Sequence, residues 1–278
     1  MHYTGFYDQI LNEIEGGNAG SAVNRLVGML DVTNLQPRAM DQACTELGAH
    51  PLTSLLFQDP AMADAARNPN EPAGRLQMLM SKTLGSETSS TGRMLFEASS
   101  ELSIMRALRG RQSGAESKLA RAWQTGGRIC LLDRAMAGIS SILAGRDQSN
   151  VTVIGDYGGG EICANYPTGA PFDLILAPDI SDHCSAAALK TAIRAMRQSL
   201  GARGKIILAT LVPQHPGTGW CRACLHWNPH CHSAETVAAI ATSEGMAALT
   251  YQDAANCVNW AELTTADDRD TGGKSDEY

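Results

Sequence analysis

The spacing of apolar residues changes near residue 126 of this 278-residue chain. Before that point, apolar side chains recur every three to four positions, as is typical of amphipathic helices. After it, short apolar runs alternate with stretches of helical spacing, which predicts an α/β sheet. The predicted helices lie at 3–30 (two helices), 38–47, 50–60, 61–67, 73–84, 93–123 with a break at Gly110–Gly114, 135–144, 185–200 and 234–244. The predicted strands lie at 129–132, 151–154, 172–177, 205–211, 247–251 and 257–263.

Three of the predicted strands end near an aspartate, namely Asp133, Asp156 and Asp179. In an open parallel sheet, ligands bind in the crevice beyond the carboxyl ends of the strands. The last two strands form a strand–turn–strand unit, and the final strand is expected to run antiparallel to its neighbour. We therefore divide the chain into an N-terminal helical cap (1–92), an α/β domain (93–265) and a charged, disordered tail (266–278).

The composition narrows the functional classes. A net charge of −7 and a pI near 5.5 argue against a nucleic-acid-binding surface. No apolar run approaches the roughly 20 residues that span a bilayer. The N-terminus lacks the pattern of a signal peptide, so a cytoplasmic location is expected. The eight cysteines are accordingly expected to be reduced, either buried or bound to metal.

Five segments, taken in order, resemble one protein family. They are HPLTSLLFQDPAMADAARNPNEPAG from residue 50, SIMRALRGRQ from 103, FDLILAPDISDH from 172, ARGKIILATLVPQHPGTGWCRACLHWNPHCHSAE from 202 and NCVNWAEL from 256. They are similar to segments of class I S-adenosylmethionine (SAM)-dependent methyltransferases of the bacterial extracellular-factor (3-hydroxypalmitate methyl ester) biosynthesis family. The resemblance covers most of residues 50–263. It implies an α/β, Rossmann-like methyltransferase sheet that follows an all-helical cap.

The resemblance also implies a cofactor site after the first strand. Asp133 and the loop with Ala135, Ala137 and Gly138 would face the methionyl part of SAM. Asp156 would either face its ribose or belong to the Gly-Asp pair of the adenine-side strand. In the family this loop reads G-x-G-x-G, whereas Ala135 and Ala137 stand at the two leading glycine positions here. Alanine disfavours a positive φ and adds a methyl group that faces the ligand.

Two further features bear on this cofactor site. Only residues 151–171 separate the first strand–helix unit from the strand at 172–177, and a complete βαβ unit takes roughly 30 residues. The predicted sheet is therefore abbreviated by one strand–helix repeat. In addition, Arg106, Arg109 and Arg111 cluster before the first strand. They either form a solvated basic face or supply one bidentate donor to a carboxylate or to the cofactor, and Arg109 is assigned to the cofactor.

Candidate catalytic residues follow two of the strands. Asp179 and His183 lie past the strand 172–177, where a methyltransferase places groups that orient or activate its acceptor. The alternative is that Asp179 only caps a helix. His226 lies in the Trp-containing segment 220–232, which is interpreted as a lid over the acceptor. A neutral histidine there can act as a general base, and the alternative is a solvated loop histidine.

The same segment contains a dense run of thiols and imidazoles. Cys221 and Cys224 form a CxxC pair, and His226 and His230 follow within six residues. Zinc is commonly held by four such ligands, so these residues form a candidate zinc site. The alternative is a Cys/His-rich lid without metal, since Pro229 interrupts any single helix that could carry both pairs.

Together these features favour a SAM-utilising enzyme of the class I methyltransferase fold that acts on a small-molecule acceptor, either a natural product or a fatty-acid-like compound. One alternative is a degenerate member that no longer binds SAM and serves as a partner subunit or a zinc-binding protein. A second alternative is a SAM-consuming cyclase. The expected partners are a small-molecule substrate, and a protein partner or a second copy of the chain. Neither nucleic acid nor a membrane is expected.

Overall fold

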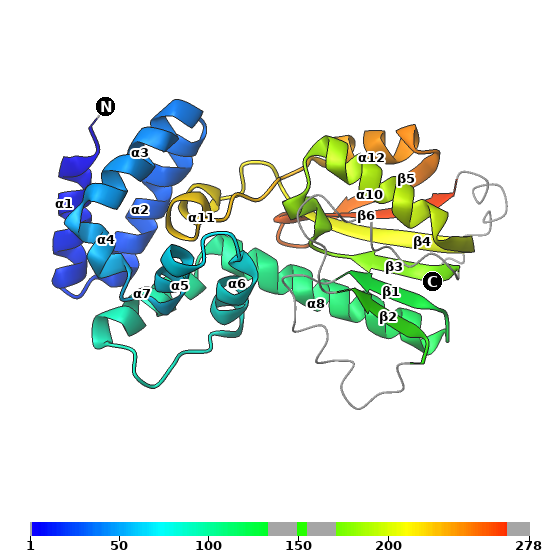
Figure 1. Ribbon diagram of the computed structural model, residues 1–278, viewed down its shortest axis with the longest axis horizontal. Coiled ribbons are helices and arrows are strands. Elements are labelled where there is room, and N and C mark those ends of the chain that lie inside the picture. Colours follow the sequence, from blue (N-terminus) through cyan, green and yellow to red (C-terminus); the bar gives the residue numbers. More distant parts are fainter. Residues whose placement is uncertain (1, 133–148, 155–170, 266–278) are drawn as a thin grey trace. The chain divides into compact units, whose positions relative to one another are not determined.

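The computed structural model describes residues 2–132, 149–154 and 171–265 (Figure 1). The chain forms two compact units. One consists of Met1–Arg109 and Gln214–Pro229, and we call it the helical unit. The other consists of Gly110–Pro213 and His230–Tyr278, and we call it the sheet unit. The helical unit thus continues beyond the expected boundary at residue 92 and includes a segment that the chain reaches only after most of the sheet.

The helical unit consists of short helices joined by tight turns. Its helices are α1 (Thr4–Glu15), α2 (Ala19–Asn34), α3 (Pro37–Ala49), α4 (Pro51–Leu56), α5 (Pro60–Arg67), α6 (Pro72–Ser81), α7 (Ser90–Ser100), the start of α8 (Ser103–Gln124) and α11 (Thr218–Cys224). Four of them, α3 to α6, begin with proline. Proline suits the first turn because its missing N–H would have no partner there and its φ is already helical. The core of this unit is apolar, with Tyr7, Ile10, Leu26, Leu30 and Met40 fully buried.

The segment Gln214–Pro229 is held in the helical unit by close contacts with α2. Asp31 accepts hydrogen bonds from the backbone N–H groups of Gly217 (2.7 Å) and Gly219 (2.9 Å), so its side chain caps the start of α11. At Gly219, a Cβ would lie 2.4 Å from the carbonyl oxygen of Leu30. Only glycine allows the two backbones to approach this closely.

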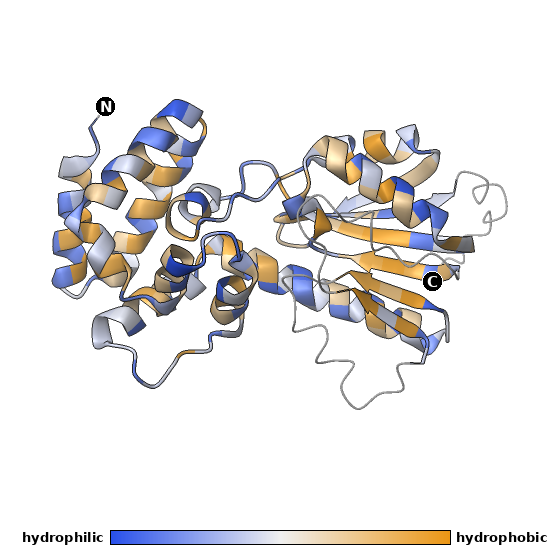
Figure 2. Ribbon diagram, in the orientation of Figure 1, coloured by the Kyte–Doolittle hydropathy of each residue, from blue (hydrophilic) through white to orange (hydrophobic). Residues whose placement is uncertain are grey.

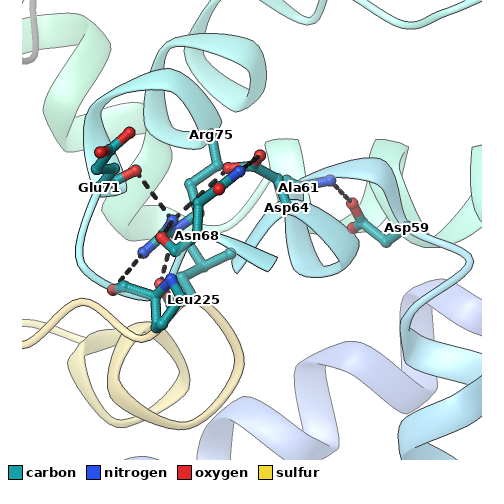
Figure 3. A network of polar contacts seen from close by, with 8 residues as sticks. Asp59, Ala61, Asp64, Asn68, Glu71, Arg75 and Leu225 are labelled. Carbon is teal, nitrogen blue, oxygen red and sulfur yellow. Dashed lines mark hydrogen bonds and ion pairs between the residues drawn. The ribbon is translucent and has the colours of Figure 1, made fainter. Parts of the chain in front are cut away.

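A buried arginine ties α5 and α6 to the same segment (Figure 3). The Arg75 side chain is 0% exposed, and its Nε donates to the carbonyl oxygen of Leu225 at 2.7 Å. Its Nη1 donates to the carbonyl oxygens of Asn68 (2.8 Å) and Glu71 (3.0 Å), and lies 3.6 Å from the Asp64 carboxylate. A buried cation is tolerated here because nearly every N–H has an acceptor.

Asp59 gives the helical unit a pH-dependent stability. Its carboxylate caps α5 by accepting from the N–H of Ala61 at 2.8 Å. Burial raises the pKa of Asp59 from 3.8 to about 6, against the lowering effect of this hydrogen bond. The unfolded chain therefore loses the proton at a lower pH than the folded chain does, so stability falls as the pH rises from about 4 to about 6.

We expect Asp59→Asn to remove this loss, because asparagine keeps the cap and cannot ionise. The variant should match the wild type near pH 4 and exceed its free energy of unfolding by about 3 kcal/mol above pH 7, since each pKa unit corresponds to about 1.4 kcal/mol. Urea unfolding of both proteins from pH 4 to 8, followed by far-UV circular dichroism, checks this. A difference that is the same at every pH would contradict it.

The sheet unit contains a mixed sheet of six strands within the described residues. They are β1 (Ile129–Leu132), β2 (Val151–Ile154), β3 (Phe172–Ala177), β4 (Leu200–Leu211), β5 (Met246–Gln252) and β6 (Val258–Thr265). The spatial order is β2-β1-β3-β4-β6-β5. The first four strands are parallel, and β6 runs antiparallel to both β4 and β5. The fold class is as predicted, including the antiparallel last strand, which lies between β4 and β5.

Helices cover both faces of this sheet. On one face, α10 (Ala186–Gln198) and α12 (Ala234–Ser243) pack on alternate strand residues such as Ile175, Leu208 and Leu263. On the other face, α8 approaches so closely that a Cβ at Gly114 would lie 2.7 Å from the Trp260 ring. Figure 2 shows the resulting apolar central strands. A parallel strand buried on both faces needs a nearly continuous apolar run, which is why β1 and β3 are recognisable from sequence.

Three expectations about local structure are wrong. The predicted break at Gly110–Gly114 is absent, and α8 is continuous. Strand β4 begins at Leu200 rather than at 205. The expected long connection after β4 contains α11. The helix predicted at 135–144 and the tail lie outside the described residues. Among the helices that are described, α8 is the longest, and none is sufficiently long and apolar to cross a membrane.

Candidate functional site

The candidate site lies at the carboxyl end of β3 in the sheet unit. The chain leaves β3 at Ala177 and forms a single 3₁₀ turn, η1 (Ile180–His183). Asp179 and Asp182 stand on this turn, and their exposed fractions are only 0% and 2%. The turn is held by a bond from the Asp182 N–H to the Asp179 carbonyl (3.1 Å) and by a bond from the Ser181 hydroxyl to the carbonyl of Ala209 on β4.

A buried ion pair joins this turn to α8. Arg111 Nη1 lies 2.7 Å from Asp182 Oδ2, and the two side chains are 2% and 1% exposed. Within the described residues, Arg111 Nε and Asp182 Oδ1 have no hydrogen-bond partner. Buried polar atoms normally have partners, so an unpaired donor and an unpaired acceptor on one buried ion pair mark this position as a candidate ligand contact.

The ionisation of the site follows from burial. Burial raises the pKa of Asp182, and the Arg111 guanidinium opposes this by favouring the carboxylate. The pKa of His230 is lowered, chiefly by burial and by the neighbouring His232. The backbone N–H of His230 donates to the backbone carbonyl of Asp182 at 2.9 Å, which holds His230 beside the turn. His230 is therefore neutral near pH 7, which is the state that a general base requires.

Two of the predicted catalytic residues lie together. His183 Nε2 is 3.9 Å from Asp179 Oδ2, and the His183 side chain is 12% exposed. His226 instead belongs to the helical unit, where it follows α11 with a φ of 47°. Asp179 and His183 thus form a close acid–base pair at the predicted edge of the sheet.

The arginine cluster divides between the two units. Arg109 is the predicted cofactor-binding member. It belongs to the helical unit and donates to the carbonyl oxygens of Ser100 (2.9 Å) and Leu79 (3.4 Å). Arg111 is the member that reaches a buried carboxylate. The sequence left open whether the three arginines form a solvated face or whether one of them reaches a carboxylate, and the packing of α8 shows that Arg111 does.

The predicted cofactor loop is not described. Asp133, Ala135, Ala137, Gly138 and Asp156 all lie outside the described residues. Their assignment to SAM stays a prediction. The same holds for the proposed loss of one repeat between β2 and β3, because residues 155–170 lie in that part of the chain.

The predicted zinc ligands do not form a cluster. No group of three or more His, Cys, Asp or Glu side chains that could hold a metal ion occurs in the described part of the chain. Cys221, Cys224 and His226 belong to the helical unit and His230 to the sheet unit. Burial raises the pKa of the Cys224 thiol, which disfavours the thiolate that zinc requires. The structure gives the zinc hypothesis no support.

No protein-family model matches the sequence, and no curated protein matches it. Among solved structures, the chain is similar to a possible exported protein from Bordetella parapertussis, with 16% identity over 69% of this chain and 79% of that one and a TM-score of 0.48. It is also similar to magnesium protoporphyrin IX methyltransferase from Synechocystis PCC 6803 with bound SAM (9% identity, 74% and 97% covered, TM-score 0.44). A third is the N-methyltransferase NodS from Bradyrhizobium japonicum WM9 (16% identity, 55% and 96% covered, TM-score 0.36). These likenesses are too remote to assign a family, so the function has to be argued from the site.

Proposed function

We propose that the protein is a SAM-utilising enzyme that transfers a methyl group to a small-molecule acceptor. The observation that carries this proposal is the buried Asp182–Arg111 ion pair at the carboxyl end of β3, where Asp179 is also buried. Buried, incompletely paired charges are costly to stability, and they gather preferentially at functional sites. They lie at the carboxyl end of β3, and ligands of open α/β sheets bind beyond the carboxyl ends of the strands.

The donors and acceptors present suit the amino-acid end of SAM. Asp182 Oδ1 is a buried acceptor without a partner among the described residues, and Arg111 Nε is a matching buried donor. An ammonium group would satisfy the first and a carboxylate the second. When bound, SAM supplies an electrophilic methyl group on a sulfonium. Asp133, the loop from Ala135 to Gly138 and Asp156 are proposed to complete its site.

The groups beside this pair are suited to prepare an acceptor. His230 is neutral near pH 7 because burial lowers its pKa, so it can accept a proton from a hydroxyl or amine. His183 Nε2 lies 3.9 Å from Asp179 Oδ2, so a second imidazole stands at the same end of β3. Methyl transfer needs positioning, exclusion of water and at most one base, and these residues supply the base.

Isothermal titration with SAM and with its demethylated product tests the proposal. We expect saturable heat with one site per chain for both ligands. Even weak binding is measurable at a ligand concentration of about 1 mM. If neither ligand gives heat at that concentration, the proposal is contradicted. That result would favour the alternative in which a methyltransferase-like protein no longer binds SAM.

A single substitution addresses the position of the site. We expect Asp182→Asn to weaken SAM binding about tenfold or more, because the proposed charge-assisted hydrogen bond to the ammonium group is lost and such a bond contributes roughly 1.5–3 kcal/mol. Asp173→Asn is the matched control, because Asp173 lies at the other end of β3 and accepts from the Arg128 N–H at 2.8 Å. Equal losses in the two variants would place the effect on the fold rather than on the edge of the sheet.

A further inference from the structure

The helical unit contains its own cavity, which the proposed function does not use. It has a volume of about 610 Å³, within the range of roughly 300–1,000 Å³ of small-molecule sites. Its walls come from α3, α4, the start of α5 and the segment that begins with α11. The lining residues are Cys44, Thr45, Leu47, Gly48, Thr53, Leu56, Phe57, Met62, Arg222, Ala223, Cys224, His226, Trp227 and Asn228.

The lining is mostly apolar and carries one permanent charge, which is positive. Leu47, Leu56, Phe57 and Met62 supply an apolar surface, and Phe57 is 42% exposed although it is a large aromatic residue. Arg222 is the lining residue with a fixed charge, and no carboxylate lines the cavity. A ligand with an apolar body and an anionic group fits this distribution.

The Arg222 guanidinium can bind a second anionic group besides the Asp41 carboxylate. Arg222 Nη2 lies 2.6 Å from the Asp41 carboxylate, and Nη1 donates to Asn34 at 3.3 Å. Asp41 is 69% exposed, whereas the Arg222 side chain is 28% exposed. Ion pairs with a solvent-exposed partner contribute little, so this pair does not prevent the guanidinium from binding a ligand carboxylate.

The two cysteine side chains that line the cavity, Cys44 and Cys224, carry no charge. Burial raises the pKa of both Cys44 and Cys224. Both are therefore protonated at neutral pH and act as small apolar groups rather than as nucleophiles. Reversible binding, without a covalent bond to sulfur, is expected.

The wall beside α11 is fixed in place before any ligand arrives. Arg75 donates to the Leu225 carbonyl, as Figure 3 shows. The backbone N–H of Trp227 donates to the Cys221 carbonyl at 3.0 Å. Between these two anchors, His226 adopts a positive φ of 47°. A strained residue persists only where its surroundings hold it, and a preformed wall reduces the entropy that a ligand must lose on binding.

Trp227 carries a second polar group at the wall of the cavity. It lines the cavity and is 5% exposed, and its indole Nε1–H has no acceptor within the described residues. A buried tryptophan usually has a partner for this group. A ligand oxygen would provide it.

We propose that this cavity binds a small, largely apolar carboxylic acid, with its ring or branched body on the Leu47, Leu56 and Phe57 surface and its carboxylate at Arg222 and Trp227. The proposal concerns the helical unit alone and does not depend on SAM binding. It assigns this unit a ligand of defined chemistry.

The probe is 2-naphthoate, with the neutral 2-naphthamide as its isosteric comparison, and binding is measured by isothermal titration to the full chain. We expect one site for 2-naphthoate and weaker binding of 2-naphthamide by about tenfold, since a charge-assisted hydrogen bond is lost. Arg222→Met should remove this difference, and Trp227→Phe should weaken both probes about threefold or more. Arg38→Met, which removes an exposed arginine of the same unit, should change nothing.

A cavity-filling variant keeps the test independent of damage to the fold. Gly48 lines the cavity on α3, and a Cβ there would meet nothing within 4 Å. Gly48→Leu should occupy the cavity and reduce 2-naphthoate affinity about tenfold or more, while leucine favours the helix over glycine. Gly28→Leu is the matched control, because Gly28 is an equally open helical glycine on α2 that does not line the cavity.

Three results would overturn the proposal. They are the absence of 2-naphthoate binding to the wild-type protein, equal affinities for the acid and the amide, and unchanged binding in Gly48→Leu. An equal loss of affinity in Gly28→Leu would also count against the cavity as the site.

Discussion

Replacing Arg75 with methionine is expected to destabilise the helical unit by about 3–5 kcal/mol, the range for removing one partner of a buried charged network. Methionine fills much of the volume but donates no hydrogen bond. The carbonyl oxygen of Leu225, a fully buried residue, would lose its 2.7 Å partner, and the loop carbonyls of Asn68 and Glu71 would lose theirs. Hydrogen exchange of peptides from 51–81 and 214–229, measured by mass spectrometry, reports the change where it occurs.

Two comparisons make this prediction specific. Arg67→Met removes an exposed arginine from the end of α5 and should leave exchange in both peptides unchanged. Arg75→Lys keeps the charge but loses the forked geometry, so it should lie between the wild type and Arg75→Met. Unchanged protection of the peptides from 214–229 in Arg75→Met would show that Arg75 does not hold that segment.

Asp182→Asn is expected to cost the sheet unit about 3–5 kcal/mol, and more than Arg111→Met does. The asymmetry follows from the chemistry of the two groups. Without Asp182, the Arg111 guanidinium stays charged and buried, because it cannot lose its proton in a protein. Without Arg111, the Asp182 carboxyl can take up a proton, and burial already raises its pKa. Urea unfolding of the two single variants measures both costs.

The double variant separates the ion pair from the packing around it. Asp182→Asn with Arg111→Met should cost less than the sum of the single changes by about 2 kcal/mol, because no unpaired charge remains. The deficit of Arg111→Met should also shrink as the pH is lowered from 8 to 5, since a carboxyl with a raised folded-state pKa loses stability as the pH rises. Strict additivity would show that the two side chains do not interact.

The sequence predicts the strands of the sheet unit well where burial on both faces requires an apolar run. Ile129–Leu132 and Phe172–Ala177 are found as predicted for this reason. The start of β4 was missed because Gly201–Gly204 contains neither an apolar run nor β-branched residues. These residues form an irregular stretch between Leu200 and Lys205, which pair with Phe172 and Leu174 of β3. The break in α8 was predicted from its glycines, but Gly114 is present because Trp260 of a distant strand packs against it.

The site was predictable in its position but not in its members. The carboxyl end of β3 follows from the alternation of strands and helices, so the sequence locates Asp179 and His183 at that edge, and their catalytic role stays a prediction. Arg109 and Arg111 are two positions apart, about 200° around a helix, so they face opposite ways, and no local pattern shows which faces the sheet. The predicted zinc site combines Cys221, Cys224, His226 and His230 because they are close in sequence. The chain, however, passes from the helical unit to the sheet unit after Pro229, so His230 lies in a different unit from the other three.

The position of α11 in the chain has a consequence for synthesis on the ribosome. Residues 214–229 complete the helical unit by packing on α2, yet they are translated after β4 of the other unit. Until they emerge, the surface around Leu30 and the Asp31 carboxylate lacks the segment that covers it, so the helical unit cannot complete its packing in chain order. A nascent chain that ends before residue 214 therefore presents an uncovered apolar surface to chaperones. Most of the helical unit is thus translated before the sheet unit, but its last segment, residues 214–229, is made only after β4.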